Sequence, residues 1–235
     1  YLIRKQFSKA MEQLVAFQTL TTKLKDEAGI SAYFFCAGSY YFSQERFATA
    51  ISYYMQSLGY KGDEKYSTYT LMGESYYYLK QYKKCIEYMQ KAIRDPYVFS
   101  EVFKVQPYCY LTRSYILLGN EPLATEYMHK LESFKVSHPE WLSNESYHGT
   151  RYLYYLHIKK NIDEAGVSLL KLNSKSALAN YGDYYYSKGN YSKSKECYKK
   201  VADKLNVWMQ SDPTQQLESY TSNFDFGRAM KELDQ

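Results

Sequence analysis

A fixed spacing of small and large residues is the feature that most constrains the fold of this chain. Within residues 32–58 it places residues at relative positions 0, 3, 12, 16 and 19, which are Gly38, Tyr41, Ala50, Tyr54 and Ser57. Residues three or four apart lie on the same face of an α-helix, which turns once in about 3.6 residues. A small, aromatic, small, large and small series at these offsets is typical of two antiparallel helices in close contact. The stretch therefore predicts a helical hairpin, with its turn at residues 44–46.

The same spacing recurs four more times along the chain. The five positions are taken in turn by Gly73, Tyr76, Cys85, Met89 and Ala92, by Thr112, Tyr115, Ala124, Met128 and Leu131, by Leu153, Leu156, Ala165, Leu169 and Leu172, and by Gly182, Tyr185, Ser194, Tyr198 and Val201. At the start of the chain, Tyr1, Ala10, Leu14 and Phe17 match the last part of one such unit. We therefore expect the chain to begin inside a repeat, with further helices upstream in a longer protein.

The period of the repeat resembles that of tetratricopeptide repeats (TPRs). Gly38 and Gly73 are 35 residues apart, close to the TPR period of about 34. The resemblance implies an all-α fold, a right-handed superhelix of about five full hairpins plus a partial first one, in which the first helix of each hairpin lines a concave face. We expect this solenoid over residues 1–210 and a tail or short helix over 211–235, with hairpins near 1–25, 32–58, 66–94, 103–133, 146–173 and 176–210.

Composition and motifs argue against several function classes. The net charge of +5 is spread along the chain, and its short lysine pairs are typical of solvated helix faces. The four cysteines form no C-x-x-C pair, which argues against a zinc or redox motif and favours a reducing compartment. There is no apolar run of about 18 residues, no secretory signal, and no motif of a hydrolase, a phosphate loop or a zinc protease. We expect a cytoplasmic protein without catalytic activity, metal or cofactor.

The register of the repeat predicts which residues face the concave groove. They stand one and four positions after the small residue, or three and six before it, and include Phe35, Ser39, Phe42, Thr70, Glu74, Tyr77, Gln106, Arg113, Tyr154, His157, Asp183 and Tyr186. Polar and charged groups on aromatic walls suit an extended peptide, whose amides need fixed partners and whose side chains need apolar niches. The alternative is that Glu74, Arg113 and Asp183 are solvated or paired with one another.

Two stretches of the chain resemble a family of bacterial regulators. Residues 33–54, with Tyr33-Phe34-Phe35, Gly38, Tyr40-Tyr41 and Ala50-Ile51-Ser52-Tyr53-Tyr54, and residues 74–81 are similar to the TPR domain of the Rap and NprR quorum-sensing regulators of the RRNPP group. The last hairpin, with Tyr184-Tyr185, Gly189-Asn190-Tyr191 and Tyr198-Lys199-Lys200-Val201, is similar too, so the resemblance covers about 30–93 and 176–210.

The resemblance implies an intracellular receptor whose groove binds a short imported signalling peptide and changes the pitch of the superhelix. Output would pass through an N-terminal module that binds DNA or a response regulator, which these residues do not contain. Receptors of this type grip the peptide backbone with Asn and Asp. At the position after the small residue, where such an Asn would stand, this chain has Ser39, Glu74, Arg113, Tyr154 and Asp183. The peptide and its contacts would therefore differ from those of the family.

Other partners stay open at this stage. A TPR adaptor that holds a segment of a partner protein is the main alternative, although the Lys and Asn of carboxylate-gripping adaptors are replaced here by Phe35 and Ser39. A homodimer is also open, and no membrane partner is expected. Nucleic-acid binding through the basic surface is a third hypothesis, but repeat packing already accounts for the interleaving of aromatic and lysine residues.

Overall fold

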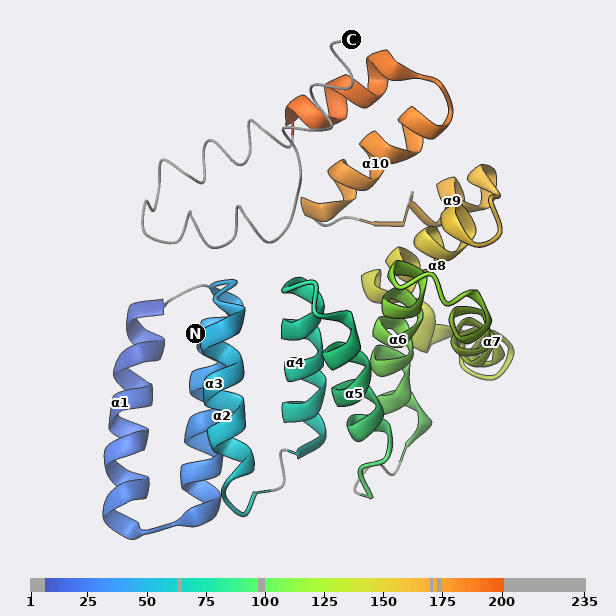
Figure 1. Cartoon of the computed structure of the whole chain (residues 1–235). Coiled ribbons are helices and arrows are strands. Elements are labelled where there is room, and N and C mark those ends of the chain that lie inside the picture. Colours follow the sequence, from blue (N-terminus) through green and yellow to red (C-terminus); the bar gives the residue numbers. More distant parts are fainter. Residues whose placement is uncertain (1–6, 63–64, 97–99, 170, 173–174, 201–235) are drawn as a thin grey trace. The chain divides into compact units, whose positions relative to one another are not determined.

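The structure is a computed structural model that describes residues 7–62, 65–96, 100–169, 171–172 and 175–200 (Figure 1). These residues form helices and turns, and no strand occurs among them. The chain divides into two compact units, Tyr1–Phe103 and Lys104–Gln235. Each unit is described by itself.

The first unit is built from helices that pack in sequential pairs. They are α1 (Phe7–Leu24), α2 (Glu27–Ser43), α3 (Phe47–Leu58), α4 (Lys65–Tyr78) and α5 (Tyr82–Ile93). Helix α2 packs on α3 and α4 packs on α5, while α1 contacts α2 and α3 contacts α4. A short 3₁₀ turn, η1 (Glu101–Lys104), follows.

The second unit repeats the arrangement. Helix α6 (Val105–Leu117) pairs with α7 (Glu121–Ser137), and α8 (Glu145–His157) pairs with α9 (Ile162–Leu169). The 3₁₀ turn η2 (Pro139–Leu142) connects the two pairs. Helix α10 (Lys175–Ser187) contacts α9, and a further helix begins at Tyr191 and is described as far as Lys200. The end of this helix and the expected tail at 211–235 lie outside the described residues.

The core explains the spacing found in the sequence. The small residues at position 12 of the five hairpins are all fully buried: Ala50, Cys85, Ala124, Ala165 and Ser194. A Cβ atom added to Gly38 would lie 2.5 Å from the ring of Tyr54, and one added to Gly182 would lie 2.6 Å from the ring of Tyr198. Glycine at position 0 therefore makes room for the large side chain at position 16. The all-α fold of paired helices is confirmed.

A left-handed residue closes the first helix of every full hairpin. It stands at position 7 each time, with φ of 62° at Glu45, 59° at Lys80, 72° at Gly119, 50° at Lys160 and 70° at Gly189. In four hairpins the next backbone N–H donates to the carbonyl at position 3, as in the bond from Arg46 to Tyr41. This is the Schellman pattern, which satisfies carbonyls that the helix end leaves free.

Stacked tyrosine pairs join the two helices of three hairpins. The side chains at positions 3 and 15 stack in the pairs Tyr41–Tyr53, Tyr76–Tyr88 and Tyr115–Tyr127, with ring centroids 5.1, 5.3 and 5.8 Å apart. A basic side chain lies over each pair, namely Arg46, Lys91 and Lys130 at 5.1, 4.5 and 4.5 Å from a ring centroid. Many of the 30 tyrosines of the chain thus serve helix packing.

Candidate functional site

In the first unit, a serine and a glutamate on the first helices of two hairpins lie near a tyrosine of the second helix α3. The hydroxyl of Ser39 on α2 donates to the carbonyl of Phe35 at 3.0 Å and accepts from the hydroxyl of Tyr54 at 3.4 Å. Burial raises the pKa of Tyr54, and the carboxylate of Glu74 on α4 raises it further. Glu74 is itself 9% exposed. The three polar groups are therefore near neighbours in a poorly solvated place.

Aromatic and hydroxyl side chains border this polar group. The half-buried Phe35 lies against Tyr54, with ring centroids 6.0 Å apart. Phe42 packs against Phe47 at 5.5 Å. The buried Thr70 donates to the carbonyl of Tyr66 at 2.9 Å, and the half-buried Tyr77 contacts Tyr82 at 5.7 Å. The predicted groove residues of this unit thus lie on two neighbouring helices, α2 and α4.

In the second unit, Arg113 joins helices instead of lining an open surface. Its guanidinium on α6 donates through Nε to Thr150 Oγ1 at 2.8 Å and through Nη2 to the carbonyl of Ser146. Both acceptors belong to α8. Gly149 makes room for this contact, because a Cβ there would lie 2.9 Å from Nη2. The side chain therefore ties the fourth hairpin to the fifth.

The other predicted residues of the second unit differ in their exposure. Tyr154 is buried, with 3% of its surface exposed, and its hydroxyl donates to Thr125 at 3.4 Å. Gln106 is half-buried, and His157 is exposed at the end of α8. Tyr186 is 45% exposed and meets Tyr191 edge-on. Of this group, His157 and Tyr186 are the most accessible to a ligand.

Asp183 on α10 repeats the arrangement of Ser39. Its carboxylate accepts a hydrogen bond from the hydroxyl of Tyr198, as Ser39 accepts one from Tyr54. Burial raises the pKa of Asp183, which the Tyr198 hydrogen bond and the nearby His157 partly offset. Although the His157 side chain is exposed at its surface, neighbouring protein atoms desolvate its imidazole enough to lower its pKa, and the Asp183 carboxylate opposes that change. The structure therefore places two of the predicted residues, His157 and Asp183, within electrostatic reach of each other.

Sequence reasoning missed the part that Tyr54 and Tyr198 play in this site, because position 16 was interpreted only as packing. Both rings pack against the glycine at position 0, and both hydroxyls donate a hydrogen bond to the side chain at position 1. The signal was present in the sequence. The other hairpins have Met89, Met128 and Leu169 at this position, and none of these side chains carries a hydroxyl.

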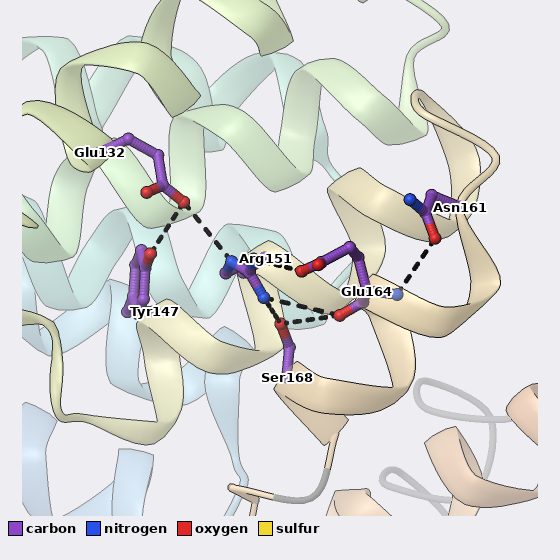
Figure 2. A network of polar contacts seen from close by, with 6 residues as sticks. All are labelled: Glu132, Tyr147, Arg151, Asn161, Glu164 and Ser168. Atoms are coloured by element: carbon purple, nitrogen blue, oxygen red, sulfur yellow. Dashed lines mark hydrogen bonds and ion pairs between the residues drawn. The ribbon is translucent and has the colours of Figure 1, made fainter.

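A second polar cluster, also missed, surrounds Arg151 (Figure 2). The Arg151 side chain is 14% exposed, and its guanidinium donates to Glu164 at 2.6 Å and to Ser168 at 2.7 Å and lies 3.5 Å from Glu132. Tyr147 donates to the same Glu132 oxygen at 2.8 Å. These residues belong to α7, α8 and α9 and point toward one another, with the Glu132 and Glu164 side chains 28% and 44% exposed. The network cross-links the fourth and fifth hairpins, and the fifth lacks the stacked tyrosine pair of the earlier ones.

The described residues offer neither a metal site nor a membrane span. They contain no group of three His, Cys, Asp or Glu side chains placed to hold a metal ion. None of the helices within these ranges is both long enough and apolar enough to cross a membrane.

Comparisons with known proteins agree with this architecture. The family model for the tetratricopeptide repeat matches residues 66–94 and 176–203, so the chain contains tetratricopeptide repeats in its third and sixth hairpins. No curated protein sequence gives a significant match.

Three solved structures show the fold. BtubC (BKLC) from P. vanneervenii is 17% identical with a TM-score of 0.52, over 90% of this chain and 93% of that one. TTC0263, a thermophilic TPR protein of Thermus thermophilus, is 13% identical with a TM-score of 0.57, over 82% of this chain and 98% of that one. A chain of the APC/C hetero-tetramer Cut9–Hcn1 is 15% identical with a TM-score of 0.58, over 95% of this chain and 46% of that one. The chain thus shares the helical-repeat fold of these three proteins.

Proposed function

We propose that this chain binds an extended peptide segment along the first helices of its hairpins. The observation that carries the proposal is a recurring polar side chain at position 1 that accepts a hydrogen bond from a tyrosine hydroxyl. Tyr54 donates to Ser39, and Tyr198 donates to Asp183. Each residue of a bound peptide carries an N–H and a C=O that need partners once water is excluded. Fixed polar groups beside half-buried rings supply such partners without a large ordering cost.

The finer proposal is that the chain is the peptide-binding regulatory domain of an intracellular bacterial quorum-sensing receptor. It rests on the resemblance of residues 30–93 and 176–210 to the Rap and NprR regulators. In this proposal a short signalling peptide changes the conformation of the helical array in the cytoplasm. An upstream module then acts on DNA or on a response regulator, with or without formation of a homodimer.

Selection from a displayed library of random short peptides tests the binding proposal. The wild-type chain should enrich peptides that bind as free synthetic peptides. Glu74→Gln should weaken this binding, because Glu74 lies on the first helix α4. Glu87→Gln is the matched control, since it removes the same charge from an exposed position on the second helix α5. Binding that responds equally to both variants, or no enrichment at all, would overturn the proposal.

The alternative function is a general TPR scaffold that holds a folded partner protein. The detected repeats favour an interaction role of either kind. The two proposals differ in the ligand that suffices for binding. A receptor should bind a free short peptide and show a change in its small-angle scattering, whereas a scaffold should bind its partner only as an intact domain and keep its scattering profile.

A further inference from the structure

Asp183 differs from the other acidic side chains for which the structure gives partners. Exposed acids on the second helices are paired with lysines, as in Glu87–Lys91 at 2.7 Å and Glu196–Lys200 at 2.6 Å. Asp183 is half-buried on a first helix, and it forms no ion pair with any described lysine or arginine. Its one side-chain hydrogen bond comes from the hydroxyl of Tyr198, which carries no charge. The chain thus keeps an uncompensated carboxylate in a partly desolvated place.

The groups around Asp183 do not neutralise it. Tyr152, which is fully buried, and Tyr198 both have their pKa raised by burial and by this carboxylate, so they remain neutral. His157 comes from the neighbouring first helix α8, and burial lowers its pKa. A neutral imidazole is not a counter-ion. A carboxylate offers about four lone-pair positions, and Tyr198 occupies one of them.

An exposed aromatic side chain stands beside the carboxylate. Tyr186 follows Asp183 by three residues and therefore lies on the same face of α10. It is 45% exposed, and Tyr191 supports it edge-on at 5.4 Å. Long basic side chains combine an apolar stem, which packs on rings, with a charged head that seeks a carboxylate. Tyr186 offers a ring for the stem, and Asp183 offers a carboxylate for the charged head.

We propose that Asp183 anchors an arginine or lysine side chain of the bound segment, with Tyr186 as the wall for its stem. The proposal rests on the peptide-binding function proposed above and adds one required feature of the ligand. Burying a charge without a partner is costly, and a basic ligand side chain would remove that cost on binding. The chain as a whole carries a net charge of +5, so its overall field does not favour a basic ligand. The preference would come from this local carboxylate.

Parallel selections from the random-peptide library test the anchor. Peptides selected on the wild-type chain should share one position occupied by Arg or Lys, and Asp183→Asn should select peptides without that preference. The Asn side chain can still accept the Tyr198 hydrogen bond, so the variant is expected to fold, which circular dichroism checks. Asp163→Asn is the matched control, because it removes an exposed carboxylate from the second helix α9 and should leave the preference intact.

A second measurement uses one selected peptide and its analogue with citrulline, or norleucine for lysine, at the basic position. The wild-type chain should lose about 10- to 100-fold in affinity for the neutral analogue, as expected for a charged hydrogen-bonded pair. Asp183→Asn should bind both peptides equally. Selected peptides without a shared basic position, or an unchanged preference in Asp183→Asn, would overturn the anchor and leave peptide binding in place. Failure to select any peptide would overturn the proposed function itself.

Discussion

Replacement of the helical glycines by alanine tests whether position 0 sets the contact between the two helices of a hairpin. In Gly38→Ala, the new methyl group would lie 2.5 and 2.6 Å from two atoms of the Tyr54 ring. That ring is fully buried and cannot swing away. In Gly73→Ala, the nearest atom is the terminal Cε of Met89 at 2.8 Å, which belongs to a flexible side chain.

The expected free energies follow from two opposing terms. Overfilling a packed core costs about 1–3 kcal/mol. Alanine stabilises a helix interior relative to glycine by about 1 kcal/mol. For Gly38→Ala the rigid ring sets the packing cost at about 3 kcal/mol, which leaves a net loss of about 2 kcal/mol. For Gly73→Ala a packing cost of about 1 kcal/mol cancels the gain in helix stability, so the free energy of unfolding should barely change.

Urea unfolding followed by circular dichroism measures both variants. Gly59→Ala is the control, because Gly59 has a right-handed φ of −76°, is exposed, and would bring its methyl group no closer than 3.2 Å to the carbonyl of Gln56. The double variant Gly38→Ala/Tyr54→Met should recover part of the loss, since methionine occupies this position in the next two hairpins. Equal stability of Gly38→Ala and wild type, or an equal loss in Gly73→Ala, would refute the packing argument.

Two further predictions concern the polar groups. Arg151→Met should lower the free energy of unfolding by about 2–3 kcal/mol, because it leaves Glu132 and Glu164 without their cation in a partly buried network. Lys91→Met breaks an exposed pair on α5 and should cost about 0.5 kcal/mol or less. Equal losses of the two variants in urea unfolding would contradict a stabilising role of the network. Raising the pH above about 10 should unfold the chain cooperatively, with tyrosinate absorbance and loss of helix coinciding. Burial raises the pKa of four tyrosines, Tyr54, Tyr147, Tyr152 and Tyr198, so the folded state keeps these protons at a pH where the unfolded chain has released them. Gradual ionisation of all tyrosines while the chain stays folded would contradict the prediction.

The packing of the hairpins could be predicted from the sequence because it depends on side-chain size at fixed offsets. Gly38 and Tyr54 stand 16 residues apart in the sequence, and their contact in the structure follows from the geometry of two antiparallel helices. The left-handed residue at position 7 was not predicted. It is a glycine in two hairpins but Glu45, Lys80 and Lys160 in the others, and those residue types do not signal a positive φ.

The candidate site was predicted less completely, because the direction of long polar side chains is not encoded in the spacing. Arg113 stands at position 1, where the register places it on the groove, yet its reach allows it to bond Thr150 and Ser146 on another helix. In the fifth hairpin Leu153 replaces the glycine, and Tyr152 and Tyr154 are buried instead. The leucine side chain fills the space that glycine leaves for a tyrosine ring in other hairpins. The register of the glycine hairpins therefore does not predict which residues of this helix are exposed.

The central claim is that the first helices carry the binding face, and hydrogen–deuterium exchange with a peptide selected from the random library tests it most directly. Binding should slow amide exchange in first helices: in α2 and α4 for a peptide held by the first unit, and in α8 and α10 for one held by the second. Exchange in the second helices α3, α5, α7 and α9 should change much less. Tight binding accompanied by protection mainly in those second helices would contradict the claim.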